Sequence, residues 1–63
     1  MTEAEALIAL NQLPRIGPVK TNRLVTTFGS ATKALTSPLQ QLEQVNGIGT
    51  ESAEIIIDWE SHS

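Results

Sequence analysis

The 63-residue chain contains no cysteine and no tyrosine. Without cysteine it can form neither a disulfide framework nor a thiolate zinc site, and it has no cysteine nucleophile. This absence is compatible with a reducing, cytosolic setting. One Trp and one Phe are the only aromatic residues. The core must therefore be built from Leu, Ile, Val and Ala, and few aromatic rings remain on which bases could stack.

A long apolar run is also missing. The most apolar stretch, Ala6 to Leu10, is far shorter than the roughly 20 residues of a membrane-spanning helix. Glu3 and Glu5 stand where a secretory signal peptide would carry positive charge. We therefore expect no membrane partner and a cytoplasmic location.

Residues for catalysis are scarce as well. A chain of this length forms one domain with a thin margin of stability and no room for a deep catalytic cleft. His62 has no defined partner, and Glu54 with Asp58, four residues apart, is more often a solvated pair than a cation site. Neither glycine-containing turn ends in the Lys-Ser/Thr of a nucleotide-binding P-loop. We expect no enzymatic activity, no cofactor and no metal.

Positive charge is limited and unevenly distributed. The chain has four Lys and Arg residues and seven Asp and Glu residues, for a net charge of −3. Residues 1–32 carry three of the cations and net +1, whereas residues 33–63 carry five of the carboxylates and net −4. The two halves therefore differ in the sign of their net charge. The three cations Arg15, Lys20 and Arg23 lie in or just after a proline- and glycine-containing stretch that can form a turn.

The pattern that is present predicts an all-α fold of five short helices, because no stretch alternates for long enough to be a strand. The expected helices span about 3–11, 18–28, 31–36, 38–44 and 50–60. Pro14 ends the first helix, Pro18 suits the first position of the second, and Gly29 can cap its C-terminus.

Hydroxyl residues predict three helix starts. Thr2 with Glu5 reads as a capping box, and Ser30 can cap the third helix. Ser37 with Gln40 reads as a second capping box.

Apolar residues at helical spacing identify the expected inward faces. They are Ala4, Leu7, Ile8 and Leu10 in the first helix; Thr21, Leu24, Val25 and Phe28 in the second; Ala31, Ala34 and Leu35 in the third; Leu39, Leu42 and Val45 around the fourth; and Ala53, Ile55, Ile56, Ile57 and Trp59 in the last. We expect Trp59 to close the core against the first helix; the alternative is docking on a neighbouring domain. Residues 61–63 are expected to be a frayed end or the start of a linker.

The two glycine-containing turns are related by an internal repeat. Aligning Gly17 with Gly49, an offset of 32 residues, also matches the flanking apolar residues. The matched pairs are Leu13 with Val45, Ile16 with Ile48, and Leu24 with Ile56. Two unrelated helix corners that both use glycine are the simpler alternative. The matching flanks favour a repeat.

In this respect the sequence resembles the tandem helix-hairpin-helix family, in which two hairpins joined by a connector helix form one compact unit. The resemblance covers nearly the whole chain. It implies one domain over residues 1–63, excised from a larger protein, with hairpins at about 3–28 and 38–60 and a connector at 30–36. Family hairpins typically read Pro-Gly-Ile-Gly, and the stretches 14–17 and 46–49 each depart from that at one position.

More narrowly, residues 6–18, Phe28-Gly-Ser30, Ala34-Leu35 and 45–49 are similar to the N-terminal domain of the DNA-processing DprA (Smf) family. This resemblance implies a Rossmann-like domain elsewhere in the parent chain, single-stranded DNA binding in natural transformation and DNA recombination, and a recombinase partner reached through the full-length protein. The C-terminal domain of the excision-repair UvrC family also shares a Phe-Gly-Ser connector and implies DNA repair. The acidic start and the Ile57-Asp-Trp59 ending favour DprA.

The first turn is the candidate DNA-binding site. A helix beginning at Pro18 leaves its early amides unpaired at the positive end of its dipole, and Gly17 lets a phosphate come close. The candidate residues are Arg15, Ile16, Gly17, Val19, Lys20 and Arg23. Such contacts hold a backbone and read no bases. An ordinary solvated polar face is the alternative for these cations.

The second turn is a weaker candidate. Gly47 and Gly49 offer similar backbone, but Glu51 and Glu54 occupy the places of Val19 and Asn22 and would compete with a phosphate for the helix dipole. We expect the second hairpin to be structural or to bind protein.

The expected function is a non-enzymatic, sequence-independent module that binds DNA weakly through its backbone, most readily as a single strand, as an accessory to a larger DNA-processing protein. The alternative is a protein-interaction or spacer module with little DNA affinity. Its acidic residues Glu51, Glu54 and Asp58 would then meet a basic partner.

Overall fold

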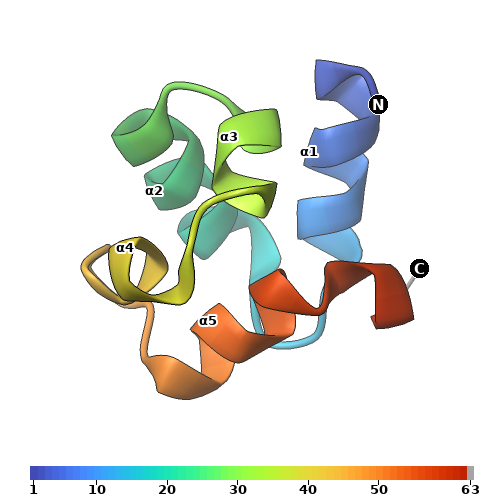
Figure 1. Ribbon diagram of the computed structural model, residues 1–63. Coiled ribbons are helices and arrows are strands. Elements are labelled where there is room, and N and C mark those ends of the chain that lie inside the picture. The colour runs from blue at the N-terminus through green and yellow to red at the C-terminus, as the bar shows by residue number, and fades with distance from the viewer. Residues whose placement is uncertain (63) are drawn as a thin grey trace.

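Five α-helices and one 3-10 helix make up most of the structure, a computed structural model that describes residues 1–62. In chain order the elements are α1 (Glu3–Gln12), α2 (Gly17–Phe28), α3 (Ala31–Leu35), α4 (Leu39–Glu43), α5 (Thr50–Ile57) and the 3-10 helix η1 (Trp59–His62) (Figure 1). The described residues include no strand. The prediction of an all-α fold with five helices is confirmed.

Side-chain caps start α1 and α3 as predicted. The Thr2 hydroxyl accepts a hydrogen bond from the Glu5 amide (3.1 Å), and the Glu5 carboxylate accepts one from the Thr2 amide (2.7 Å), which completes the capping box. The Ser30 hydroxyl accepts from the Lys33 amide (3.1 Å). At the end of α2, Gly29 takes a left-handed backbone with φ of 88°. These boundaries are determined locally, by residues within one helical turn.

The predicted capping box of Ser37 with Gln40 is wrong. The Ser37 hydroxyl instead donates to the Lys33 carbonyl in the last turn of α3 (2.6 Å). Pro38, with an extended backbone, stands at the N-cap of α4 without a side-chain cap hydrogen bond. Because so few residues separate α3 from α4, the Ser37 hydroxyl lies within reach of the last carbonyls of α3, and it adds a bond to the Lys33 carbonyl, which also accepts from the Thr36 amide (3.3 Å).

The last helix is shorter than predicted. α5 ends at Ile57 rather than Glu60, and the chain continues as η1. In η1 the Ser61 hydroxyl donates to the Asp58 carboxylate (2.9 Å). Residues 61 and 62, expected to be frayed, are therefore helical, and Ser63 lies outside the described residues.

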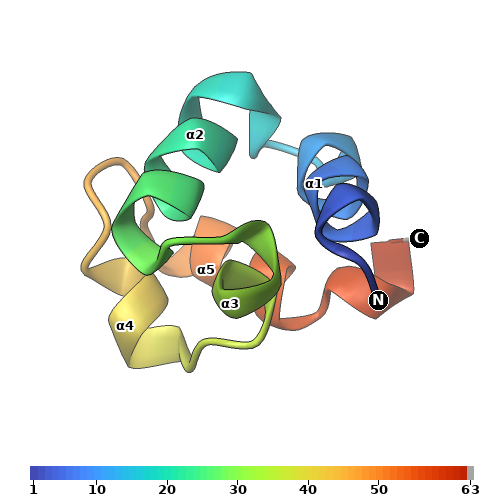
Figure 2. The same ribbon diagram turned by 90° about the horizontal axis from the view of Figure 1, so that it is seen from above.

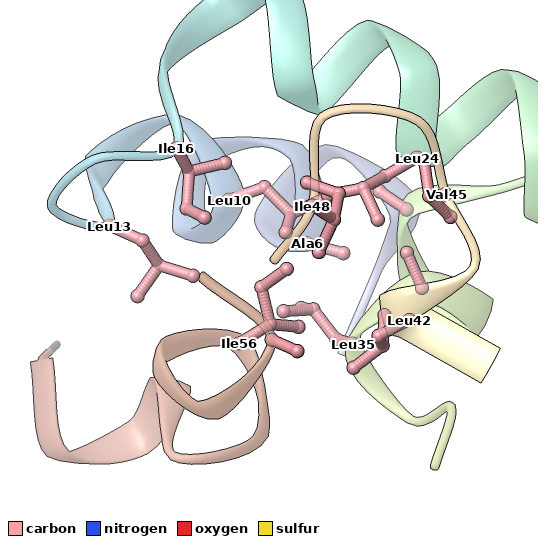
Figure 3. Close-up of a cluster of buried hydrophobic side chains, with 13 residues drawn as sticks. Ala6, Leu10, Leu13, Ile16, Leu24, Leu35, Leu42, Val45, Ile48 and Ile56 are labelled. Carbon is pink, nitrogen blue, oxygen red and sulfur yellow. The ribbon is translucent and has the colours of Figure 1, made fainter. Parts of the chain in front are cut away.

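One core gathers side chains from all five α-helices and from the segments 13–16 and 45–48 (Figure 3). Its buried apolar members are Ala6, Leu10, Leu13, Ile16, Leu24, Ala31, Ala34, Leu35, Leu42, Val45, Ile48, Ala53 and Ile56. α3 packs against both α1 and α2, and α4 packs against α5 (Figure 1, Figure 2). α3 therefore lies against both N-terminal helices, and its three predicted inward residues, Ala31, Ala34 and Leu35, are buried.

The inward face of α1 differs from the predicted one. Ala6 and Leu10 are fully buried, whereas Ala4 is exposed and Ile8 is 57% exposed. Leu7, also predicted to face inward, is half-buried. α1 carries apolar residues on more than one side, so helical spacing alone fits two faces. Contact with α2 and α3 selects the face of Ala6 and Leu10.

The other predicted inward faces are buried at their centres and partly exposed near the helix ends. Leu24 and Ile56 are fully buried, while Phe28 is only half-buried. Ile57 is 48% exposed, so its predicted inward position is wrong. Trp59 is half-buried against the core, and η1 packs on α1, as expected. Side chains near a helix end have fewer neighbours to cover them, because the packed face stops there.

Glu3 joins α1 to α3. Its carboxylate accepts hydrogen bonds from the amides of Ala31 and Thr32 and from the Thr32 hydroxyl (2.9 Å). It thus places negative charge at the N-terminus of α3, where the free amides favour it. The backbone hydrogen bond from Ala31, followed by that from Thr32, lowers the pKa of Glu3 below its usual value.

This contact predicts an acid-dependent loss of stability. Because the pKa of Glu3 is lower in the folded chain, its contribution is present above the usual carboxyl pKa of about 4.3 and is lost as the pH falls through the folded value. Glu3→Gln should lower the melting temperature at pH 7, and the difference from the parent chain should shrink below about pH 4. Glu54→Gln, the same change at an exposed position of α5, is the control. Equal pH profiles for parent and Glu3→Gln would contradict the prediction.

No helix in residues 1–62 is long and apolar enough to cross a bilayer. The longest, α2, has 12 residues.

Candidate nucleic-acid interface

The two turns of the predicted repeat have matching backbone hydrogen bonds. We call residues 13–17 the first turn and residues 45–49 the second turn. Each is closed by two bonds at positions 32 residues apart: Leu13 N to Leu10 O (3.2 Å) and Ile16 N to Leu13 O (3.4 Å) in the first, and Val45 N to Leu42 O (3.1 Å) and Ile48 N to Val45 O (2.9 Å) in the second. The offset found in the sequence therefore relates equivalent local structures.

Matching apolar residues anchor both turns in the core. Ile16 and Ile48 are 4% and 3% exposed, and Leu13 and Val45 are 5% exposed each. Figure 3 shows Ile48 among side chains of α1 and α2, and Ile16 near Leu10. Ile16, a candidate DNA-binding residue, can therefore offer a ligand only its backbone.

Equivalent positions of the turns take a left-handed backbone. Arg15 has φ of 66° and Gly47 has φ of 89°. For a residue with a side chain this conformation costs about 1–2 kcal/mol, so the arginine stands where glycine would be less strained. The turns differ at their last position, because Gly17 has φ of 68° while Gly49 is extended, with φ of −87°.

The helices that follow the turns begin without side-chain caps. Neither α2 nor α5 has a side-chain hydrogen bond at its N-cap. α1 and α3, in contrast, are capped by Thr2 and Ser30, and α3 also receives Glu3. Pro18, the second residue of α2, has no amide hydrogen to satisfy. The N-termini of α2 and α5 therefore keep amides that can donate to an anion.

Arg15 forms an ion pair with Glu51 of α5. The two side chains are 66% and 67% exposed, so the pair contributes about 0–1 kcal/mol at most. The charge of Arg15 at the first turn is thus partly compensated by a carboxylate from the other half of the chain. Sequence spacing gave no indication of this pair.

Lys20 also contacts the second half. Its Nζ donates to the Arg15 carbonyl (2.8 Å) and to the Ser52 hydroxyl (3.2 Å). Lys20 and Ser52 are equivalent positions of the repeat, 32 residues apart. The two helices after the turns therefore meet at matching places, and Lys20 is held beside the first turn.

Arg23 reaches the second turn rather than the first. Its Nη1 group donates to the Asn46 carbonyl (3.1 Å). A Cβ placed on Gly47 would lie 2.6 Å from the same nitrogen, so the absence of a side chain there lets the guanidinium approach. The sequence placed Arg23 among the candidates of the first turn; the closeness of α2 to residues 46–47 decides its partner.

Val19 is the most exposed large apolar residue of the candidate site, at 64%. It lies near the start of α2, next to the amides that no side chain caps. Gly47 and Gly49 are also exposed. The backbone of both turns is thus accessible, with the cations arranged around it.

A pair of glycine substitutions tests the contact of Arg23. Gly47→Ala and Gly29→Ala should each destabilise the chain by about 1 kcal/mol, because both positions have φ near 90°. Nothing lies within 4 Å of a Cβ at Gly29, whereas at Gly47 the guanidinium must move. Only Gly47→Ala should shift the NMR signal of the Arg23 side chain. An unchanged signal in Gly47→Ala would contradict the contact.

The surface also carries an apolar groove. Met1, Ile8, Trp59 and His62 help to line an apolar groove of about 200 Å³ between α1 and η1. In residues 1–62, no three His, Asp or Glu side chains come together in a way that could hold a metal ion.

Comparison with known proteins gives a similarity over most of the chain. The UvrABC system protein C of Zymomonas mobilis is 39% identical over 54 residues. The match covers 86% of this chain but only 8% of that protein. No protein-family model and no solved structure matches the chain.

Proposed function

We propose that this chain is a tandem helix-hairpin-helix module of a DNA-repair or DNA-processing protein, and that it binds the DNA backbone without reading sequence and without catalysing a reaction. The observation that carries the proposal is the pair of equivalent turns. Each leads into a helix without a side-chain cap, and Arg15, Lys20 and Arg23 lie around them. In this proposal α1 with α2 and α4 with α5 are the two hairpins, and α3 is the connector.

The similarity to a UvrABC component supports a role in DNA repair. It favours the second of the two resemblances seen in the sequence, the excision-repair family, over the DprA family. A DprA-like role in natural transformation, a Rossmann-like neighbour, a recombinase partner and a preference for single-stranded DNA remain predictions, as does a cytoplasmic location. All of them concern the parent protein more than this segment.

Binding would begin at the first turn. A backbone phosphate placed against the start of α2 could accept hydrogen bonds from its free amides, with Lys20 close beside it. Val19 would contact the sugars. Because only about three cations take part, the logarithm of the binding constant should fall with the logarithm of salt concentration with a slope of roughly −2 on a single strand. Weak binding with a shallower salt dependence than that of dedicated DNA binders is the expected behaviour.

The experiment is a titration of labelled single- and double-stranded oligonucleotides into the isotopically labelled chain, followed by amide NMR shifts at low salt. Shifts that include residues 15–23 and fade as salt is added are expected. The absence of any shift at millimolar DNA would overturn the proposal, as would shifts confined to α3 and η1.

The ion pair of Arg15 leads to a prediction about Glu51. Glu51→Gln removes a carboxylate that competes with phosphate for Arg15, so DNA affinity at low salt should rise by roughly threefold. Stability should change by less than about 1 kcal/mol, because the pair is exposed. Glu54→Gln changes the net charge equally on the same helix and is the control. Equal gains in both variants would mean that net charge alone, and not the ion pair, limits binding.

The alternative function, a protein-interaction module that presents acidic residues to a basic partner, has less support. Glu51 is already engaged by Arg15, and the Asp58 carboxylate accepts a hydrogen bond from Ser61. If variants of Glu54 and Asp58 changed the binding of a basic protein while DNA binding was absent, this alternative would replace the first.

A further inference from the structure

We infer that the apolar groove between α1 and η1 is a docking site for a short basic segment of a partner protein. The segment would place one or two large apolar side chains in the groove and Lys or Arg beside them. The inference goes beyond the proposed function and concerns a different surface, since none of Arg15, Lys20 and Arg23 lines the groove. It can hold whether or not the chain binds DNA.

The groove is lined mainly by apolar side chains. Met1 and Ile8 line it and are 59% and 57% exposed. Trp59 enters from η1, half-buried against the core, and also lines the groove. Met1 and Ile8 are two of the four large apolar side chains that are exposed in residues 1–62. Their gathering at one groove, with a Trp between them and the core, is typical of a surface that a partner covers.

The size of the groove limits what can occupy it. Its volume is about 200 Å³, below the roughly 300–1,000 Å³ of sites that enclose whole small molecules. A cavity of about 150 Å³ holds one benzene-sized group, so this groove has room for one or two large apolar side chains. The occupant is therefore an anchor from a larger partner, the kind of residue that contributes most to binding at protein interfaces.

Negative charge surrounds the groove. Residues 1–13 and 58–62, the two segments that line it, carry four carboxylates and no Lys or Arg. Glu5 lines the groove itself. The hydrogen bond from the Thr2 backbone amide lowers the pKa of Glu5 below its usual value, so this carboxylate is charged at neutral pH. A partner with Lys or Arg beside its apolar anchors meets complementary charge here.

The same charges disfavour the other occupants of an apolar groove. A second copy of this chain would bring two acidic grooves together, and like charges across an interface cost binding energy. A DNA backbone or an anionic lipid surface would be repelled for the same reason. A basic segment that carries its own apolar anchors fits both the lining and the charge.

A synthetic peptide tests the inference. The probe is a short peptide of alanines and lysines with two leucines four residues apart, so that both leucines lie on one helical face. Titrated into the chain, it should change the fluorescence of Trp59, the only tryptophan. A peptide with glutamates in place of the lysines should bind at least tenfold more weakly. A peptide with alanines in place of the leucines should lose most of its affinity.

Two matched pairs of variants locate the peptide. Ile8→Ser should weaken peptide binding roughly tenfold, whereas Ile57→Ser, at an exposed position of α5 outside the groove, should change it little. Gln12→Lys adds positive charge to the groove and should weaken binding roughly threefold, whereas Gln41→Lys, the same change on α4, should not. Lysine suits the last turn of a helix, so Gln12→Lys should remain folded, which melting curves check.

The remaining outcomes separate this inference from the proposed function. No change in Trp59 fluorescence at millimolar peptide would overturn the inference, as would equal binding of the lysine and glutamate peptides. Self-association of the chain that Ile8→Ser abolishes would assign the groove to a second copy and also overturn it. Ile8→Ser should bind DNA as the parent chain does. A loss of DNA affinity in that variant would make the groove part of the DNA surface and contradict a separate docking site.

Discussion

Leu10→Ala is expected to destabilise the chain by about 3 kcal/mol, whereas Ile8→Ala, two residues earlier on the same helix, should cost less than about 0.5 kcal/mol. Leu10 is fully buried, and its truncation leaves a cavity among residues of several helices. Ile8 is 57% exposed. A domain of this length has a total stability of only about 3–9 kcal/mol, so the first substitution removes a large part of it.

Chemical denaturation of both variants, followed by circular dichroism at 222 nm, measures the difference. The pair is informative because spacing in the sequence predicted both Ile8 and Leu10 to be inward, and the packing of α1 on α2 and α3 buries only Leu10. Equal destabilisation by the two substitutions would show that α1 does not pack on the face described above.

Lys20→Glu is expected to reduce DNA affinity at low salt by at least tenfold, compared with a small loss for Lys33→Glu. Both changes alter the net charge by the same amount. Lys20 lies beside the first turn, held by the Arg15 carbonyl and Ser52. Lys33 is exposed on α3 and belongs to neither turn. Fluorescence anisotropy with a labelled oligonucleotide, repeated at several salt concentrations, measures the effect.

The loss of two hydrogen bonds must be separated from the loss of charge. Lys20→Glu removes the bonds to Arg15 and Ser52, which together are worth about 1–2 kcal/mol. Lys20→Met removes the same bonds without adding a negative charge, so it should melt like Lys20→Glu and bind DNA better. If Lys20→Glu and Lys33→Glu weakened binding equally, the first turn would have no special part in it.

Local features of the sequence predicted local structure well. The capping box of Thr2 and Glu5, the cap at Ser30 and the left-handed Gly29 all appear where expected, because each depends on residues within one helical turn. The local error at Ser37 arose where two helix ends compete for one hydroxyl, and the predicted end of the last helix was also wrong, since α5 ends at Ile57 rather than Glu60. The internal repeat could also be found in the sequence, and its equivalent apolar residues are buried in both turns.

The partners of the charged residues could not be predicted in the same way. Arg15 with Glu51 and Arg23 with Asn46 join residues from opposite halves of the chain. A hydrogen bond of this kind depends on how closely two helices approach, and no spacing along one helix encodes that distance. Charge counting therefore assigned Arg23 to the first turn, although it contacts the second.

The sequence by itself determined the class of the fold, the positions of the turns and the residues that anchor them, because proline, glycine, capping hydroxyls and apolar spacing act over a few residues. Only the tertiary structure decided which face of α1 is buried and which turn each cation contacts. Those choices are made by packing between segments some 30 residues apart, where shape and distance, rather than local preference, select the contact.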